Sequence, residues 1–330
     1  MRLSAIGLIL TFILGLFVAP LTAKTQQVGK VPRIGYLGYD AAVQAQSLQS
    51  FLDGLRTLGY VDGQNIALEY RWAAGRFDRL PALAAELVGL PVDILVTAAG
   101  PLAVRAAQQA TTTTPIVAQI MNDPVAAGFV TSLARPGGNI TGQAFQDTEL
   151  IPHQVELLRE AVPRLSRLAV LWHVAGSGAR VVQVVEDAVQ AVGLQFHIQE
   201  VQEPSDLDRA VAAAKTWGAQ ALLQLPSPFF NQHRPLLVAL LTTHQLPALC
   251  ETRLEVDEGC LMTYGVNFNA MARRTAYYVD RILQGATPAE LPVERPMKFE
   301  LVINLKTAKA LGITIPPALL FQADGVIRED

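Results

Sequence analysis

Hydrophobic positions along this chain alternate between two kinds of segment. Short apolar runs at 33–39, 93–97 and 115–120 are typical of buried β-strands. Between them, apolar residues recur every three or four positions at 48–58 and 80–90, which is typical of helices with one buried face. Strands that alternate with helices in this way predict a parallel sheet with both faces covered.

The same alternation begins a second time after a glycine-rich break at 137–142. A helix at 152–161 and a strand at 167–172 open this second series. The other helices and strands are expected at 65–71, 102–110, 181–192, 195–201, 207–217, 221–225, 234–243 and 247–250. The predicted fold class is α/β, with two doubly wound units of similar length. When the carboxyl ends of two such sheets face each other, they form a cleft, which is a common ligand site.

Composition supports two folded domains and excludes some classes of partner. The 330 residues suffice for two domains of ordinary size, and 51% hydrophobic against 17% charged residues excludes a disordered chain. The net charge of −3 provides no basic field that would attract nucleic acid. We therefore expect no nucleic-acid partner.

The first 23 residues have the pattern of a secretion signal. Arg2 supplies a positive charge, an uncharged apolar run follows, and small residues around Ala23 suit a cleavage site. We expect a signal peptide at 1–23, cleavage after Ala23 and a periplasmic location for the rest of the chain. An uncharged stretch of this length could instead be retained as a membrane anchor.

Cysteine usage leaves two alternatives open. Cys250 and Cys260 are the only cysteines, and their spacing matches no Cys-x-x-Cys metal or redox motif. An oxidising compartment would permit a disulfide between them, because a turn-like segment separates them. The alternative is that both are small buried apolar residues.

Motifs that carry catalysis are absent from the sequence. It contains no Gly-x-Ser-x-Gly elbow, no Walker loop and no Gly-x-Gly-x-x-Gly fingerprint. The histidines show no metal-ligand spacing on a helix. The sequence therefore predicts a protein that is not an enzyme and has no cofactor and no metal site.

Small, polar and aromatic residues follow the predicted strands, where such sheets bind ligands. In the first unit these candidate ligand-binding residues are Tyr39, Asp40, Ala99, Gly100, Asn122 and Asp123. In the second unit they are His173, Ser177, Ser227, Tyr264 and Asn267. Each could instead be a turn or cap residue, and Asn122-Asp123-Pro124 would then begin a helix.

Some of these candidates have a defined chemistry. Ala99 and Gly100 lie at a helix entrance, whose free backbone N–H groups can receive a carboxylate. Tyr39 and Tyr264 could stack on a ligand and donate a hydrogen bond to it. His173 follows a strand, where a lone histidine is more often a hydrogen-bonded wall residue than a catalytic one.

Two long motifs carry a resemblance to a known family. The first comprises Asp123-Pro124-Val125, Gly128-Phe129-Val130 and the run at 132–142. The second comprises 291–294, 299–312 and 315–317. The sequence resembles the ABC transporter substrate-binding proteins, a family that includes tryptophan- and tyrosine-binding members. The resemblance extends from about residue 33 to residue 324.

The resemblance implies a type I periplasmic-binding-protein fold with two Rossmann-like lobes joined by several crossovers. Its N-terminal lobe would comprise 31–142 plus about 268–290, and its C-terminal lobe 143–266 plus about 291–330. The first crossover would lie at 143–145, which adds Phe145 to the candidate ligand-binding residues. The resemblance also implies delivery of the ligand to an ABC permease in the inner membrane, without cofactor or chemistry. Because one polypeptide supplies both walls of the cleft, we expect a monomer.

The sequence also departs from the family. His173-Val174-Ala175-Gly176 replaces a common Asn-Pro turn on the expected ligand wall, and Thr263-Tyr264-Gly265 replaces a frequent Ser-Tyr-Gly. The expected ligand is therefore a small organic molecule, with aromatic and branched amino acids as the first class to test.

The leading hypothesis is the extracytoplasmic solute-binding component of an ABC importer, which captures its ligand by lobe closure. A sensory ligand-binding module for a receptor or kinase is the first alternative, since it would use the same cleft. An exported α/β enzyme is the second, and the absent catalytic motifs oppose it. A cytoplasmic repressor's effector domain would share the fold, but the export signal opposes it.

Overall fold

The first half of the chain builds a five-stranded parallel sheet. A computed structural model describes residues 31–145, 147–175, 180–296 and 299–328, so the expected signal peptide lies outside the described residues. The strands of this sheet, which run in the order β2-β1-β3-β4-β5, are β1 (Arg33–Gly38), β2 (Ala67–Trp72), β3 (Ile94–Thr97), β4 (Ile116–Met121) and β5 (Ile140–Ala144). The central strands are buried almost throughout, which explains their continuous apolar sequences.

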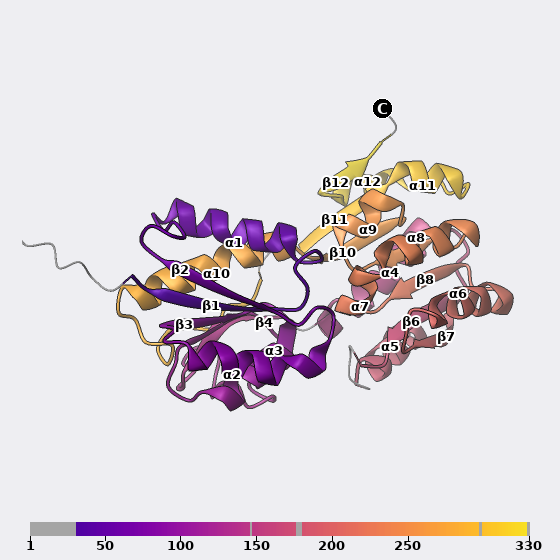
Figure 1. Ribbon diagram of the computed structural model, residues 1–330. Coiled ribbons are helices and arrows are strands. Elements are labelled where there is room, and N and C mark those ends of the chain that lie inside the picture. Colours follow the sequence, from indigo (N-terminus) through magenta and orange to yellow (C-terminus); the bar gives the residue numbers. More distant parts are fainter. Residues whose placement is uncertain (1–30, 146, 176–179, 297–298, 329–330) are drawn as a thin grey trace, which may run out of the picture. The chain divides into compact units, whose positions relative to one another are not determined.

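Helices cover both faces of this first sheet (Figure 1). They are α1 (Ala45–Thr57), α2 (Leu80–Gly89), α3 (Gly100–Ala110), α10 (Phe268–Leu283) and the short 3-10 helix η1 (Phe77–Arg79). The buried faces of α1 and α10 share one core cluster with β1, whereas α2 and α3 share another with the opposite face of the sheet. We call this sheet with its helices the first lobe.

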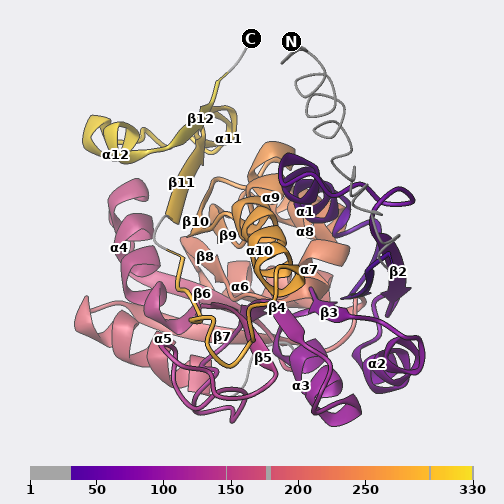
Figure 2. The same cartoon turned by 90° about the vertical axis from the view of Figure 1, so that its left-hand side faces the viewer.

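The second half of the chain builds a seven-stranded sheet, mostly parallel. Its strands, in the order β12-β11-β10-β9-β8-β6-β7, are β6 (Arg167–His173), β7 (Gln195–Val201), β8 (Ala221–Gln224), β9 (Ala248–Cys250), β10 (Met262–Val266), β11 (Phe299–Asn304) and β12 (Gly325–Ile327). Only the β10–β11 pair of this sheet is antiparallel among the described residues. Figure 2 shows that β11 and β12, from the C-terminal part of the chain, continue the sheet beyond β10.

Helices also cover this second sheet on both faces. The helices of this half are α4 (Ile151–Ala161), α5 (Arg180–Ala191), α6 (Asp206–Trp217), α7 (Pro228–Gln232), α8 (Arg234–Thr243), α9 (Arg253–Glu258), α11 (Leu305–Ala310), α12 (Pro317–Gln322) and the 3-10 helix η2 (Asp147–Glu149). Helices α4, α5, α11 and α12 contribute to one core cluster, and α6 to α9 contribute to the other. We call this sheet with its helices the second lobe.

The glycine-rich break predicted at 137–142 is in part a strand, since β5 begins at Ile140. Gly142 has a φ of +133°, and a Cβ at this position would lie 2.0 Å from the carbonyl oxygen of Ala118 in β4. Only glycine permits this approach of the two strands. The Asn139 side-chain amide donates to the carbonyl oxygen of Thr114 at 2.9 Å, which fixes the entry into β5.

The segment after β4 is a series of turns, so the interpretation of Asp123 as the start of a helix is wrong. Asp123 has a φ of +39°, in the left-handed region, and its carbonyl oxygen accepts a hydrogen bond from the amide of Ala127 at 2.9 Å. A residue with this backbone conformation ends regular structure rather than opening a helix.

The cysteine alternatives are resolved in favour of pairing. Cys250 ends β9, Cys260 precedes β10, and their sulfur atoms form a disulfide with a Cα–Cα distance of 6.4 Å. The ten-residue spacing between them contains α9, so the disulfide closes a loop that carries this helix.

Candidate functional site

A cavity of about 930 Å³ lies between the carboxyl ends of the strands of the two lobes. On the first lobe the strand order reverses between β1 and β3, and ligands of open α/β sheets bind at such a switch point. Tyr39 follows β1, and Ala99 and Gly100 follow β3, and all three line the cavity. The volume lies within the usual range for small-molecule sites.

The second lobe presents its own switch point to the same cavity. There the order reverses between β6 and β8, and Arg180 after β6 and Ser227 after β8 line the cavity. The segment after β9, which includes the start of α9, contributes 251–254, and the end of β10 contributes Gly265 and Val266. Both lobes thus supply residues from the ends of several strands.

The structure places seven of the twelve sequence-predicted residues in the lining of this cavity. They are Tyr39, Ala99, Gly100, Asn122, Asp123, Ser227 and Asn267. Ser177 lies outside the described residues. The remaining predicted residues, Asp40, Phe145, His173 and Tyr264, lie near the cavity but outside its lining.

Asp40 and His173 are occupied by contacts within their own lobes. The Asp40 carboxylate accepts a hydrogen bond from the amide of Ala42 at 2.9 Å, as in a turn. The His173 Nδ1 lies 2.8 Å from the Ser227 Oγ, and its ring stacks on Phe229 with centroids 4.4 Å apart. Burial lowers the pKa of His173 below its ordinary value. His173 therefore supports α7 beside the cavity.

Phe145 and Tyr264 belong to an aromatic cluster next to the cavity. Both rings contact Phe299, with centroid distances of 6.1 Å and 5.9 Å respectively. They line a second, much smaller cavity instead of the main one. Their contacts place them where the chain passes between the lobes, after β5, near the end of β10 and at the start of β11.

Several lining residues carry no signal in the sequence. Gln44 and Ser47 lie at the start of α1, and Gln119 lies within β4. The Gln119 side chain is 4% exposed, and its Nε2 donates to the Ser47 Oγ at 3.0 Å. These residues were not predicted, because they lie within a strand or at the start of a helix and not after a strand end.

The N-terminus of α3 offers an anion site on the first-lobe wall. Its N-cap residue Ala99 provides no side-chain cap, so the first-turn amides are free for a ligand. Gly100 has a φ of +70°, a backbone conformation that glycine adopts readily. Because the positive end of the helix dipole lies here, the wall suits a carboxylate.

Carboxylates predominate over cations among the described lining residues. Arg180 lies 3.8 Å from Asp123, and Arg253 lies 3.7 Å from Asp257. The other two acidic groups accept hydrogen bonds, Glu251 from the Ser227 backbone amide at 3.1 Å and Glu300 from the Asn267 side-chain amide at 2.6 Å. The excess of negative charge favours a ligand with a positively charged group.

No metal site is indicated within the part of the chain that the structure describes, since no three His, Cys, Asp or Glu residues there gather as metal ligands. In the same part, no helix combines the length and apolar character needed to cross a membrane.

Comparison with known proteins decides the family. A model of the family described as ABC transporter substrate binding protein matches residues 40–327. The chain belongs to this family. The tyrosine-binding protein of Clostridioides difficile (strain R20291) is 24% identical over 283 residues, which cover 84% of this chain and 81% of that protein.

Solved structures share the fold of this substrate-binding protein. A conserved domain protein from Vibrio cholerae is 26% identical, with a TM-score of 0.83, over 90% of this chain and 100% of that one. The ABC domain in complex with L-Trp from Streptococcus pneumonia is 24% identical, with a TM-score of 0.82 and the same coverage. The predicted α/β fold of the type I periplasmic binding proteins is confirmed, as is the resemblance to the family.

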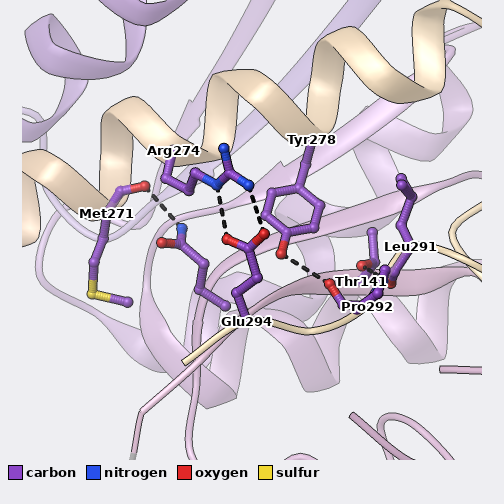
Figure 3. Close-up of polar contacts among 8 residues, drawn as sticks. Thr141, Met271, Arg274, Tyr278, Leu291, Pro292 and Glu294 are labelled. Carbon is purple, nitrogen blue, oxygen red and sulfur yellow. Dashed lines mark hydrogen bonds and ion pairs between the residues drawn. The ribbon is translucent and has the colours of Figure 1, made fainter. Parts of the chain in front are cut away.

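The segments that connect the lobes of this substrate-binding protein are tied together (Figure 3). The Arg274 guanidinium of α10 makes two hydrogen bonds to the Glu294 carboxylate, at 2.8 Å and 2.6 Å. The Glu294 backbone in turn pairs with β5, since its carbonyl oxygen accepts from the amide of Ala144 at 2.8 Å. The Tyr278 hydroxyl donates to the carbonyl oxygen of Pro292 at 2.9 Å.

Proposed function

We propose that this protein is the extracytoplasmic solute-binding component of an ABC importer, and that it captures its ligand by closure of the two lobes. The observation that carries the proposal is the cavity of about 930 Å³ that loops from both lobes line together. A ligand that contacts both walls is held only when the lobes are close, so binding and closure are coupled.

We propose an amino acid as the ligand, with aromatic and branched side chains as the first candidates. The names of a tyrosine-binding relative and of a structure in complex with L-Trp support this class. The chemistry of the walls supports it independently. The α3 N-terminus suits a carboxylate, and Glu251 and Glu300 suit an ammonium group, so the cavity is complementary to a zwitterion.

The proposed lobes follow the limits expected from the sequence, 31–142 with 268–290 and 143–266 with 291–330. Residues 1–23 would act as a signal peptide, with cleavage after Ala23 and release into the periplasm. The partner would be an inner-membrane ABC permease that receives the ligand from a monomer. The cavity binds the ligand without altering it, and no cofactor takes part.

A thermal-shift screen of residues 24–330 tests the proposal. The panel contains L-amino acids, nucleosides, purines and small sugars. A ligand that binds only the folded protein adds about 2.7 kcal/mol at one hundred times its Kd, which raises the unfolding midpoint clearly. We expect an aromatic or branched amino acid to give this shift and to be recovered unchanged.

Asp123→Ala should reduce that shift, because it removes a carboxylate from the cavity wall. Asp187→Ala, at an exposed position of α5 outside the lining, is the control and should leave the shift unchanged. A panel compound recovered in chemically altered form would contradict the proposal and favour an enzyme. Equal binding of every compound class would contradict the amino-acid assignment.

A further inference from the structure

A specific contact joins the two lobes beside the cavity. The Tyr39 hydroxyl of the first lobe lies 3.0 Å from the Gln232 Oε1 of the second lobe. The same hydroxyl donates to the carbonyl oxygen of Gly75 at 2.9 Å. Tyr39 follows β1, Gly75 follows β2, and Gln232 is the last residue of α7, so the contact bridges the switch-point region of the first sheet and the second lobe.

Tyr39 is held in place by its own lobe. Its ring packs on Phe77 with centroids 4.7 Å apart, and only 3% of the residue is exposed. Burial, and then the nearby Asp40, raises the pKa of Tyr39 to about 12. The hydroxyl therefore keeps its proton at neutral pH and shares it between the Gly75 carbonyl oxygen and the Gln232 Oε1.

Gly75 has no side chain and so leaves room for the Gln232 side chain to pack against its backbone. Its φ of +78° is one that residues with a Cβ rarely adopt, and a Cβ there would lie 2.6 Å from the Gln232 Nε2. Any larger residue at position 75 would therefore displace the Gln232 amide. The absence of a side chain at this turn is thus part of the fit between the lobes.

Gln232 is presented by a helix that is firmly anchored in the second lobe. Phe229 and Phe230 bury α7 in the core, and the Ser227 side chain caps it by accepting from the Phe229 amide. His173 stacks beneath Phe229. Helix α7 thus holds the backbone of Gln232, whose exposed side chain reaches across to the first lobe.

We propose that Tyr39, Gly75 and Gln232 form a latch that holds the lobes closed and controls the rate at which the cavity opens. This proposal rests on the proposed function in one respect, because the latch regulates the lobe closure that was proposed there. Three groups that separate elements position meet at this point, two from the first lobe and one from the second. The Asp123–Arg180 ion pair also spans the lobes, but an ion pair exposed at both ends contributes little, whereas the Tyr39 end of the latch is buried.

The latch assigns Tyr39 a positioning role instead of a stacking role toward the ligand. Loss of a hydrogen bond of ordinary strength changes an equilibrium about fivefold. The ratio of open to closed protein should therefore rise about fivefold in Tyr39→Phe, which retains the ring against Phe77. Gln232→Ala should have at least this effect, because it also removes the contact with Gly75.

Distances between spin labels on the two lobes measure this ratio directly without ligand. Ala82→Cys on α2 and Ala239→Cys on α8 provide exposed labelling positions, and the native cysteines do not react because they form a disulfide. In the labelled protein, Tyr39→Phe, Gln232→Ala and Gly75→Ala should each shift the distance distribution toward the longer, open separation. A ligand, once found, should also dissociate faster from each variant.

Gly63→Ala is the matched control for Gly75→Ala. Gly63 has a nearly identical φ of +77° in the same lobe, but nothing lies within 4 Å of an added Cβ. Both alanine variants carry the same backbone strain, so only displacement of Gln232 separates them. Gly63→Ala should lower the unfolding midpoint without changing the distance distribution.

Distance distributions that are the same in the wild type and the three latch variants would overturn the proposal. Equal shifts in Gly63→Ala and Gly75→Ala would also overturn it, because strain alone would then explain both. If the latch variants open the lobes as predicted but the wild type binds no compound in the screen, the proposed ligand class fails and the latch stands.

Discussion

Glu255 shows at the scale of one residue how the cavity wall is supported. It belongs to α9, where its side chain is fully buried, and Arg253 and Asp257 of the same helix line the cavity. The carboxylate accepts hydrogen bonds from the Thr252 amide at 2.8 Å and from the Gln224 Nε2 at 2.8 Å. This is a capping box, which satisfies the first amides of the helix. Burial nevertheless raises the pKa of Glu255.

Glu255→Gln is expected to stabilise the protein at pH 8 by about 1 kcal/mol. A raised pKa in the folded state means that Glu255 loses stabilising free energy as pH rises through that pKa. Glutamine has no such dependence and can still cap the helix. With the Gln224 amide turned over, it can also donate to the Gln224 Oε1, a buried acceptor with no hydrogen-bond partner among the described residues.

Chemical denaturation of both proteins between pH 5 and pH 8 checks this expectation. The difference in unfolding free energy between the Glu255→Gln variant and the wild type should grow as pH rises. Glu160→Gln, at an exposed position of α4, is the control and should show no such trend. A difference that shrinks toward pH 8 would show that the ionised carboxylate is the stabilising form.

At the residue scale, most of the predicted residues that line the cavity are ones that follow strand ends. Tyr39, Gly100 and Asn122 were predicted because carboxyl ends of parallel strands share one edge of a sheet. Gln119 and Gln232 were not predicted, because one lies inside a strand and the other at the end of a five-residue helix. Their roles come from the packing of segments that are far apart in the sequence.

At the scale of elements, the segments that link the lobes are joined to one another by side-chain contacts. The Arg274–Glu294 pair ties α10 to the segment that runs beside β5. Gln143 adds to this link, since its Nε2 donates to the Met271 carbonyl oxygen at 2.8 Å. In the proposed closure, these segments should therefore bend as one unit.

Glu294→Gln should therefore lower the unfolding free energy by about 0.5–1 kcal/mol. The expected loss of unfolding free energy is small because both side chains of the pair are about 40% exposed to solvent. Glu149→Gln is the matched control, because Glu149 pairs with Arg295 at 3.3 Å on the surface without bidentate geometry. Urea denaturation measures both. An equal effect of the two variants would show that the Arg274–Glu294 pair has no special role.

Element prediction succeeded where hydrophobic periodicity was long enough to read. The strands at 33–39 and 167–172 and the helix at 152–161 agree closely with β1, β6 and α4. Short helices such as α7 and α9 give no periodic signal, because one or two turns contain too few apolar positions. The glycine-rich start of β5 was read as a break, since glycine is equally typical of turns.

At the scale of the whole molecule, two successive α/β units were predicted and two sheets are present. The order of the strands within each sheet could not be predicted from the hydrophobic pattern. In particular, β11 joins β10 antiparallel and extends the second sheet from the C-terminal end of the chain. Pairing of this kind depends on which edge strand is uncovered after the rest has folded.

Under the proposed function, one ligand occupies the cavity between the lobes. Calorimetric titration of residues 24–330 with the best compound of the screen tests this claim. We compare the wild type with Asn231→Trp, which fills the cavity from α7, and with Gln190→Trp, an exposed control on α5. We expect one ligand per chain in the wild type and in Gln190→Trp, and at least tenfold weaker binding in Asn231→Trp. Equal affinity in all three proteins would contradict it.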